Sequence, residues 1–253
     1  MNGSLISSSI ALMGSRGLGV ILELLTTVYL ARHLSLAAMG QFALAYSLLG
    51  LVRATGSFGV DQASVRQIAR ASHGAVVSDE AQRLSLAGIA IALICGALLG
   101  LSMFGLHLLT GVNIMLALAI PAYVFIGLMV GQIRGLGHNL LAQTPEAVGL
   151  QLAILAIVVL SGADSAIVAL CVAGWVIAMV QIAIRARVGL KLDVGLDLAP
   201  MKRLISEGFG IFQAQVFTVL AMRAPVFLAA AVLDLRPLRL SKLQQSSEIF
   251  LHC

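Results

Sequence analysis

Charged residues are scarce in this sequence. Only 11% of its 253 residues are Asp, Glu, Lys or Arg, whereas 60% are hydrophobic, and the mean hydropathy is +1.02. Soluble domains carry about 25% charged residues, so this composition excludes an ordinary soluble domain and is typical of a membrane protein. The net charge of +5 does not indicate nucleic-acid binding, because the positive residues lie mainly in short segments beside apolar runs.

Cysteine and histidine are also rare and scattered. Cys95 and Cys171 lie inside apolar runs and Cys253 is the last residue, so no disulfide framework or metal-ligand spacing is present. None of the five histidines forms an HxxxH or HxxE pair. The sequence also lacks a Walker motif and a nucleophile elbow. These absences predict a protein that is not an enzyme and that holds no cofactor or metal.

The apolar runs are long and continuous, which predicts an all-α fold, a polytopic transmembrane helical bundle. Membrane strands would alternate polar and apolar residues instead, in segments of about ten. The predicted spans lie at about 6–30, 40–60, 84–109, 112–133, 146–161 and 165–184, with a seventh at 204–233. All but the fifth approach the roughly 20 residues that cross a bilayer. Pro145 is expected in the first turn of the fifth helix.

Positive residues are concentrated in every second connection between these spans. The segments 61–83, 134–145 and 185–203 contain nine of them: Arg66, Arg70, Arg83, Arg134, Arg185, Arg187, Lys191, Lys202 and Arg203. The alternate connections contain only Arg32. The positive-inside rule therefore predicts a cytoplasmic N-terminus. No Lys or Arg precedes the first apolar run, so we expect that helix to remain rather than to be cleaved as a signal peptide.

This pattern predicts one six-helix lobe and the start of a second. We assign residues 1–184 to the N-terminal lobe, 185–203 to a cytoplasmic inter-lobe loop and 204–233 to a seventh transmembrane helix. Residues 234–253 place three positive residues on the predicted outer side and depart from the loop pattern. We interpret this tail as a truncated or frameshifted end.

Four charges inside the apolar runs are the candidate functional residues. Arg16 and Glu23 lie seven residues apart, on one face of a helix, Arg53 lies in the second run, and Arg223 precedes Pro225 in the seventh. An arginine at the centre of a membrane helix costs about 2.5–3.5 kcal/mol, so such residues usually face a bundle interior. We expect Arg16 to contact an anionic substrate and Glu23 to take part in proton or cation coupling, while Arg223 beside a proline kink is typical of a working cavity. Structural pairing of the first two, and snorkelling of Arg53, are the alternatives.

Several short motifs resemble the beginning of Wzx-type polysaccharide flippases, of the multidrug/oligosaccharidyl-lipid/polysaccharide exporter superfamily. They are Ser15-Arg16-Gly17-Leu18-Gly19, Tyr29-Leu30-Ala31-Arg32-His33-Leu34, Gly40-Gln41-Phe42-Ala43, Gly56-Ser57-Phe58-Gly59-Val60-Asp61 and Arg66, and the resemblance covers about residues 8–232. It implies two lobes around a central cavity. It also implies export of an undecaprenyl-diphosphate-linked oligosaccharide by alternating access, with the arginines on the diphosphate.

The same resemblance implies a location in the bacterial inner membrane. The expected partners are lipid-linked oligosaccharide, membrane lipids and other polysaccharide-assembly membrane proteins, with no nucleic acid. Two alternatives remain open: a cation-coupled small-molecule exporter of the same fold, and a non-transporting membrane subunit. The exporter would be expected to have a cavity dominated by acidic residues, whereas this sequence has three buried arginines against Glu23 and Glu207.

Overall fold

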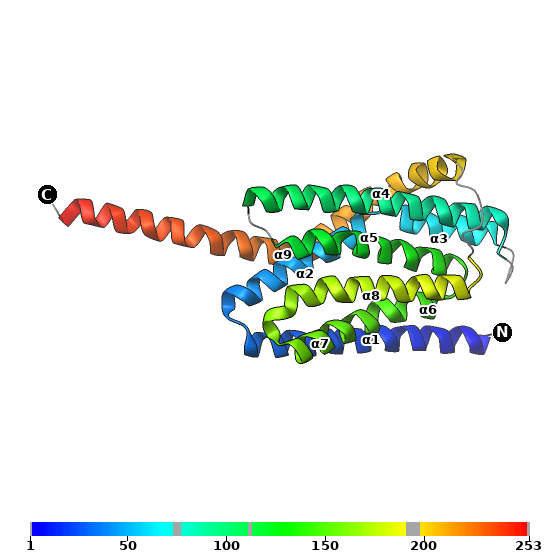
Figure 1. The fold of residues 1–253 in the computed structure, drawn as a ribbon, viewed down its shortest axis with the longest axis horizontal. Helices are drawn as coiled ribbons and strands as arrows, with labels where there is room; N and C mark the ends of the chain where they lie inside the picture. Colours follow the sequence, from blue (N-terminus) through cyan, green and yellow to red (C-terminus); the bar gives the residue numbers. More distant parts are fainter. Residues whose placement is uncertain (1, 73–76, 111–112, 191–197, 252–253) are drawn as a thin grey trace.

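The computed structural model describes residues 2–72, 77–110, 113–190 and 198–251, and the side chains of most of these between Ile10 and Leu228. Every regular element in the described part is helical, which confirms the expected fold class (Figure 1). The α-helices are α1 (Asn2–His33), α2 (Leu36–Thr55), α3 (Val60–Ala71), α4 (Asp79–Thr110), α5 (Ile114–Gly135), α6 (Asn139–Thr144), α7 (Leu150–Ser161), α8 (Ala166–Arg187) and α9 (Leu198–Leu251). A π-helix, η1 (Pro145–Gly149), joins α6 to α7, and a 3₁₀ turn, η2 (Ala163–Ser165), precedes α8.

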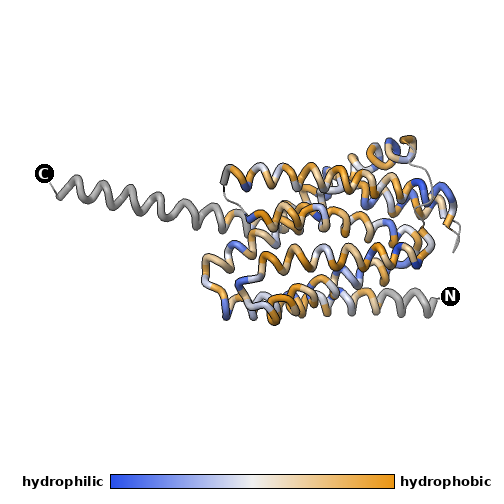
Figure 2. The backbone as a smooth tube through the Cα atoms, viewed as in Figure 1, coloured by the Kyte–Doolittle hydropathy of each residue, from blue (hydrophilic) through white to orange (hydrophobic). Residues whose placement is uncertain are grey.

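Seven helical segments in the described part are long and apolar enough to cross a membrane, the number that was predicted. They are Ile10–His33, Leu36–Ala71, Asp79–Leu108, Ile114–Gly135, Asn139–Ser161, Ala163–Arg187 and Leu198–Met222. Figure 2 shows hydrophobic residues along the long helices and a group of hydrophilic ones where α4 begins. The chain is thus a multi-pass membrane protein.

The second span is longer than predicted and is broken. Residues beyond 60 were expected to form a loop because of their charges, but α3 continues the span after a turn that contains Phe58 and Gly59 at positive φ. The helix forms because Val60, Ala63 and Ile68 share a buried face. Gly59 is required in the turn, since a Cβ there would lie 2.2 Å from the carbonyl oxygen of Gly208 in α9.

The fifth span begins earlier than predicted, at Asn139, and Pro145 lies inside it. A proline within an α-helix lacks the amide hydrogen and clashes with the preceding turn. Here η1 widens that turn, and the Leu150 amide donates to the Pro145 carbonyl oxygen, five residues back. The proline therefore marks a π-bulge and not the beginning of a helix.

The centre of the bundle is α5, which packs against α2, α3, α4 and α8 (Figure 1). Two of its glycines allow this, because a Cβ on Gly127 would lie 2.8 Å from the carbonyl oxygen of Arg53, and one on Gly131 would lie 2.3 Å from that of Asp61. Small residues at such positions let membrane helices approach closely. The α2–α3 break is consequently held against the middle of α5.

A buried polar cluster ties α4, α5 and α8 together. Ser85 Oγ donates to Gln132 Oε1 at 2.6 Å and accepts from the Arg185 guanidinium at 3.2 and 3.3 Å, while Gln132 Nε2 donates to the Ser85 carbonyl oxygen at 2.8 Å. Arg185 was assigned to the inter-lobe loop, but it lies in the last turn of α8 and is only 3% exposed. Its charge faces protein rather than the membrane surface, because Ser85 lies beside it.

The first helix of the predicted second lobe, α9, lies across α2, α3 and α4. Its polar end is held by ion pairs from Arg203 to Glu80 at 2.9 Å and from Glu207 to Arg70 at 3.8 Å. The helix begins at Leu198, six residues before the predicted seventh span, and its segment Leu198–Met222 qualifies as a membrane span among the described residues. Most side chains beyond that residue lie outside the described part, so the interpretation of residues 234–253 stays a prediction.

Gly131→Ala is expected to destabilise the protein by about 1–3 kcal/mol, since the added methyl overlaps the Asp61 carbonyl oxygen and forces α3 away from α5. Gly105→Ala in α4 is the matched control, because no atom lies within 4 Å of its Cβ position, and it should hold or raise stability by up to about 1 kcal/mol. Thermal unfolding of both variants in detergent measures the difference. Equal midpoints for the two variants would contradict the packing argument.

Candidate functional site

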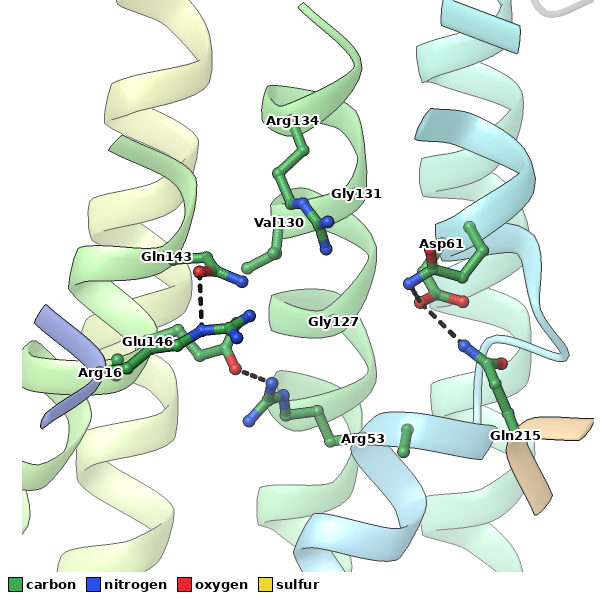
Figure 3. A pocket seen from close by; sticks show the side chains of 13 residues that line it. Arg16, Arg53, Asp61, Gly127, Val130, Gly131, Arg134, Gln143, Glu146 and Gln215 are labelled. Atoms are coloured by element: carbon green, nitrogen blue, oxygen red, sulfur yellow. Dashed lines mark hydrogen bonds and ion pairs between the residues drawn. The ribbon is translucent and has the colours of Figure 1, made fainter. Parts of the chain in front are cut away.

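A polar cavity of about 340 Å³ lies between the first lobe and α9. Five charged side chains line it, from five different elements (Figure 3): Arg16 of α1, Arg53 of α2, Asp61 of α3, Arg134 of α5 and Glu146 of η1. Three glutamines complete its polar lining: Gln62, Gln143 and Gln215. All eight residues belong to segments that qualify as membrane spans. The structure therefore gathers charges that are far apart in sequence into one cavity among the candidate membrane spans.

The charge of Arg53 is compensated inside this cavity. Its guanidinium forms an ion pair with Glu146, whose side chain is 13% exposed, against 35% for the arginine (Figure 3). Arg53 stands in the last turn of α2, beside the α2–α3 break, with its backbone against Gly127. The charge of Arg53 is therefore balanced by Glu146, and the side chain does not need to extend to the membrane surface.

Arg16 approaches the same cavity from α1. Its Nε donates to Gln143 Oε1 at 3.1 Å, and Gly19, one turn further along, packs against the carbonyl oxygen of Ala147. A side chain at position 19 would meet that oxygen at 2.4 Å, so the glycine sets how closely α1 approaches η1. The polar partner of Arg16 is a neutral amide, and its positive charge therefore remains available to an anion.

Asp61 forms the opposite wall, where α3 begins. It is 9% exposed, and its carboxylate accepts hydrogen bonds from Ser57 Oγ at 3.0 Å, Gln62 Nε2 at 3.1 Å and Gln215 Nε2 at 3.4 Å. Three neutral donors can stabilise a buried carboxylate without an adjacent cation. The bond from Gln215 joins α9 to the first lobe at the cavity itself.

Arg134, in the last turn of α5, extends towards the same space (Figure 3). The lining residues thus include three arginines and two carboxylates, an excess of one positive charge. A guanidinium presents five donors in a planar fork that matches the oxygens of carboxylate and phosphate groups. Chemically, the cavity is suited to an anionic group that can accept hydrogen bonds from these guanidinium groups.

Two of the predicted site residues, Arg16 and Arg53, are brought together here, and their role in binding stays a prediction. Glu23 does not line the cavity: it shares a helical face with Arg16, but seven residues of rise place it about 10 Å further along α1. The Arg223 side chain lies outside the described residues. Within the part that is described, no group of three His, Cys, Asp or Glu residues is suited to a metal.

Sequence reasoning missed Asp61, Arg134 and Glu146. The first two were assigned to loops, and the third was placed in the first turn of a short helix. Pro145 was the available signal, because a proline inside a helical pattern marks a kink or bulge, and such distortions frequently accompany functional sites in helices.

The sequence matches the family described as polysaccharide biosynthesis protein over residues 5–236. A solved structure of a MOP superfamily transporter from Pyrococcus furiosus, for which reversed polarity of the binding pocket suggests a different function, is similar in fold. The TM-score is 0.64 at 18% identity, and the match covers 87% of this chain and 53% of that chain. The chain therefore spans about half the length of that transporter. No curated protein matches the sequence.

Arg134→Gln is expected to weaken the binding of inorganic pyrophosphate to the purified protein by about 10-fold or more, because a charged hydrogen bond to phosphate is lost. Arg70→Gln removes the same charge outside the cavity, where Arg70 pairs with Glu207, and should have little effect. Isothermal titration in neutral detergent gives both dissociation constants. A similar loss in the two variants would show that only the net charge of the protein matters.

Proposed function

This chain belongs to the polysaccharide biosynthesis protein family, a family of MOP-superfamily transporters, and on that premise we propose that it acts in flipping lipid-linked oligosaccharide. The proposed substrate is an undecaprenyl-diphosphate-linked oligosaccharide, moved from the cytoplasmic to the outer leaflet. The observation that carries this proposal is the intramembrane cavity, with Arg16, Arg53 and Arg134 in its lining.

The diphosphate is the part of such a substrate whose transfer into the hydrocarbon of the bilayer is least favourable. Moving unpaired charges into the bilayer is strongly unfavourable, so a transport route needs cationic partners at membrane depth. Arginine suits phosphate better than lysine does, because its fork binds two oxygens at once. The three arginines approach from three different helices, and together they can surround a diphosphate on several sides (Figure 3).

Two distortions adjoin the cavity and support a mechanism by alternating access. One is the α2–α3 break next to Asp61, and the other is η1, which carries Glu146. Discontinuous helices and π-bulges are common at the binding sites of transporters and other functional sites. The lobe movement in this proposal exposes the cavity to each side of the membrane in turn, while the polyprenyl tail remains in the lipid.

The proposed location is the bacterial inner membrane, with the N-terminus in the cytoplasm. The uneven distribution of positive residues between alternate connections supports this orientation, although Arg185 now belongs to the buried cluster and Arg134 to the cavity. The proposed partners are lipid-linked oligosaccharide, membrane lipids and other polysaccharide-assembly membrane proteins. Since the match covers 53% of the solved transporter, activity of a whole transporter forms part of the proposal.

A cation-coupled small-molecule exporter of the same fold is the alternative, and Asp61 and Glu146 in the cavity are what favour it. Acidic residues in a membrane cavity attract cationic substrates and carry coupling ions. Against it, arginines outnumber the acidic residues in this lining, and Arg53 pairs with one of them. The excess of positive charge favours an anionic substrate.

Arg16→Ala, introduced at the chromosomal locus, is expected to lower surface polysaccharide about 10-fold or more, with lipid-linked intermediates accumulating inside the cell. Arg32→Ala is the matched control, because Arg32 is exposed at the other end of α1 and does not line the cavity. Surface polysaccharide is quantified alongside the amount of each variant in the membrane. Normal export by Arg16→Ala at an equal membrane level would remove Arg16 from the mechanism.

A further inference from the structure

The Arg53–Glu146 ion pair raises a question that the proposed function leaves open. Both residues line the cavity, so an anion that reaches Arg53 meets a guanidinium already bound to a carboxylate. We propose that Glu146 is an internal competitor of the substrate, and that it makes the cavity selective for a diphosphate over anions with a single charge. This inference rests on the proposed function and assigns a specificity-determining role to a residue of the same site.

Glu146 is held where it can compete. The π-bulge that carries it lies between α1 and α8: Ala147 meets Gly19 on one side, and a Cβ on Gly149 would lie 3.0 Å from Ile177 Cδ1 on the other. The backbone on both sides of position 146 is thus held by its neighbours, and in the proposal only the side chain moves when a substrate reaches Arg53. A substrate can displace this carboxylate from Arg53 but cannot remove it from the cavity.

The charges that face the Arg53–Glu146 pair determine which anions can displace Glu146 from Arg53. Arg16 approaches from α1 and Arg134 from α5, and Asp61 adds a negative charge from α3 (Figure 3). An anion with one charge, such as the phosphodiester of a bulk phospholipid, offers Arg53 no more charge than Glu146 already supplies. A diphosphate carries enough charge to engage Arg53 together with Arg16 and Arg134, and this offsets the loss of the internal pair.

Competition by Glu146 would keep the phosphodiester headgroups of ordinary phospholipids out of the cavity. The cavity lies among the candidate membrane spans, and the phospholipids of the surrounding bilayer greatly outnumber the lipid carrier. Arginines alone would accept any phosphate. Breaking the Arg53–Glu146 pair costs every anion that engages Arg53, so an anion with one charge gains nothing there, whereas a diphosphate also contacts Arg16 and Arg134; the carboxylate therefore sets an affinity threshold that the single-charge anion does not pass.

A double-mutant cycle tests the inference, using the wild type, Glu146→Gln, Arg53→Gln and the double variant. Isothermal titration of the purified proteins in neutral detergent gives dissociation constants for inorganic pyrophosphate and for dimethyl phosphate, a single-charge phosphodiester. Glu146→Gln should bind pyrophosphate about 10-fold tighter than the wild type, and dimethyl phosphate, which the wild type should not bind measurably, should bind to this variant; binding of dimethyl phosphate by the wild type as tight as that of pyrophosphate would overturn the selectivity. Glu80→Gln, whose partner Arg203 lies outside the cavity, controls for net charge.

The cycle separates competition from simple repulsion. Glu146→Gln removes one negative charge in both backgrounds, but it releases Arg53 only where Arg53 is present, so its effect should be several-fold larger there. Equal effects in the two backgrounds would overturn the inference, as would weaker pyrophosphate binding by Glu146→Gln, which would show that the carboxylate positions Arg53 for the anion.

Three further outcomes are decisive. If Glu146→Gln does not fold, Glu146→Asp replaces it, since the shorter carboxylate draws back from Arg53 and should tighten pyrophosphate binding in part; unchanged or weaker binding overturns the inference. If no protein binds either anion, both the inference and the assignment of this cavity to a diphosphate are wrong. If pyrophosphate binds and depends on Arg16 without coupling between Arg53 and Glu146, only the inference is wrong.

Discussion

The central constraint on this protein is that a charge placed inside a membrane span must find its partner within the protein. Hydrocarbon supplies no solvation, so the charged side chains of the cavity depend on partners within the protein. Arg53 depends on Glu146, Arg16 on Gln143, and Asp61 on a ring of neutral donors. These contacts join α1 to α6, α2 to η1 and α3 to α9 around one cavity.

The convergence is made possible by close backbone packing on α5. Gly127 and Gly131 admit the carbonyl oxygens of Arg53 and Asp61, and they therefore bring both sides of the α2–α3 break to the same helix. At the wall of the cavity formed by α1, Gly19 allows the carbonyl oxygen of Ala147 in η1 to approach the helix closely. Small residues thus do more than allow helices to pack: they set the distance across which the polar side chains meet.

Much of the fold was predictable, because membrane spans are defined by local hydropathy. The seven spans follow from continuous apolar runs, and Arg16 and Arg53 stood out as charges within them. Asp61 and Arg134 were assigned to loops since they lie near the ends of those runs, where a charge is ordinarily solvated. Glu146 was misplaced because Pro145 has two interpretations, a helix start or an internal bulge, and only packing against α1 and α8 decides between them.

The sequence alone determined that this chain crosses the membrane several times and that arginine is unusually frequent inside its spans, because composition and hydropathy are sums over neighbouring residues. The resemblance of its short motifs to polysaccharide flippases is likewise local, and the family match confirmed it. The pairing of Arg53 with Glu146, ninety-three positions later, and the exclusion of Glu23 from the cavity were decided by the tertiary structure only. The reason is that which charges meet depends on helix register, on the π-bulge and on glycine contacts, and none of these is expressed in the hydropathy of any one segment.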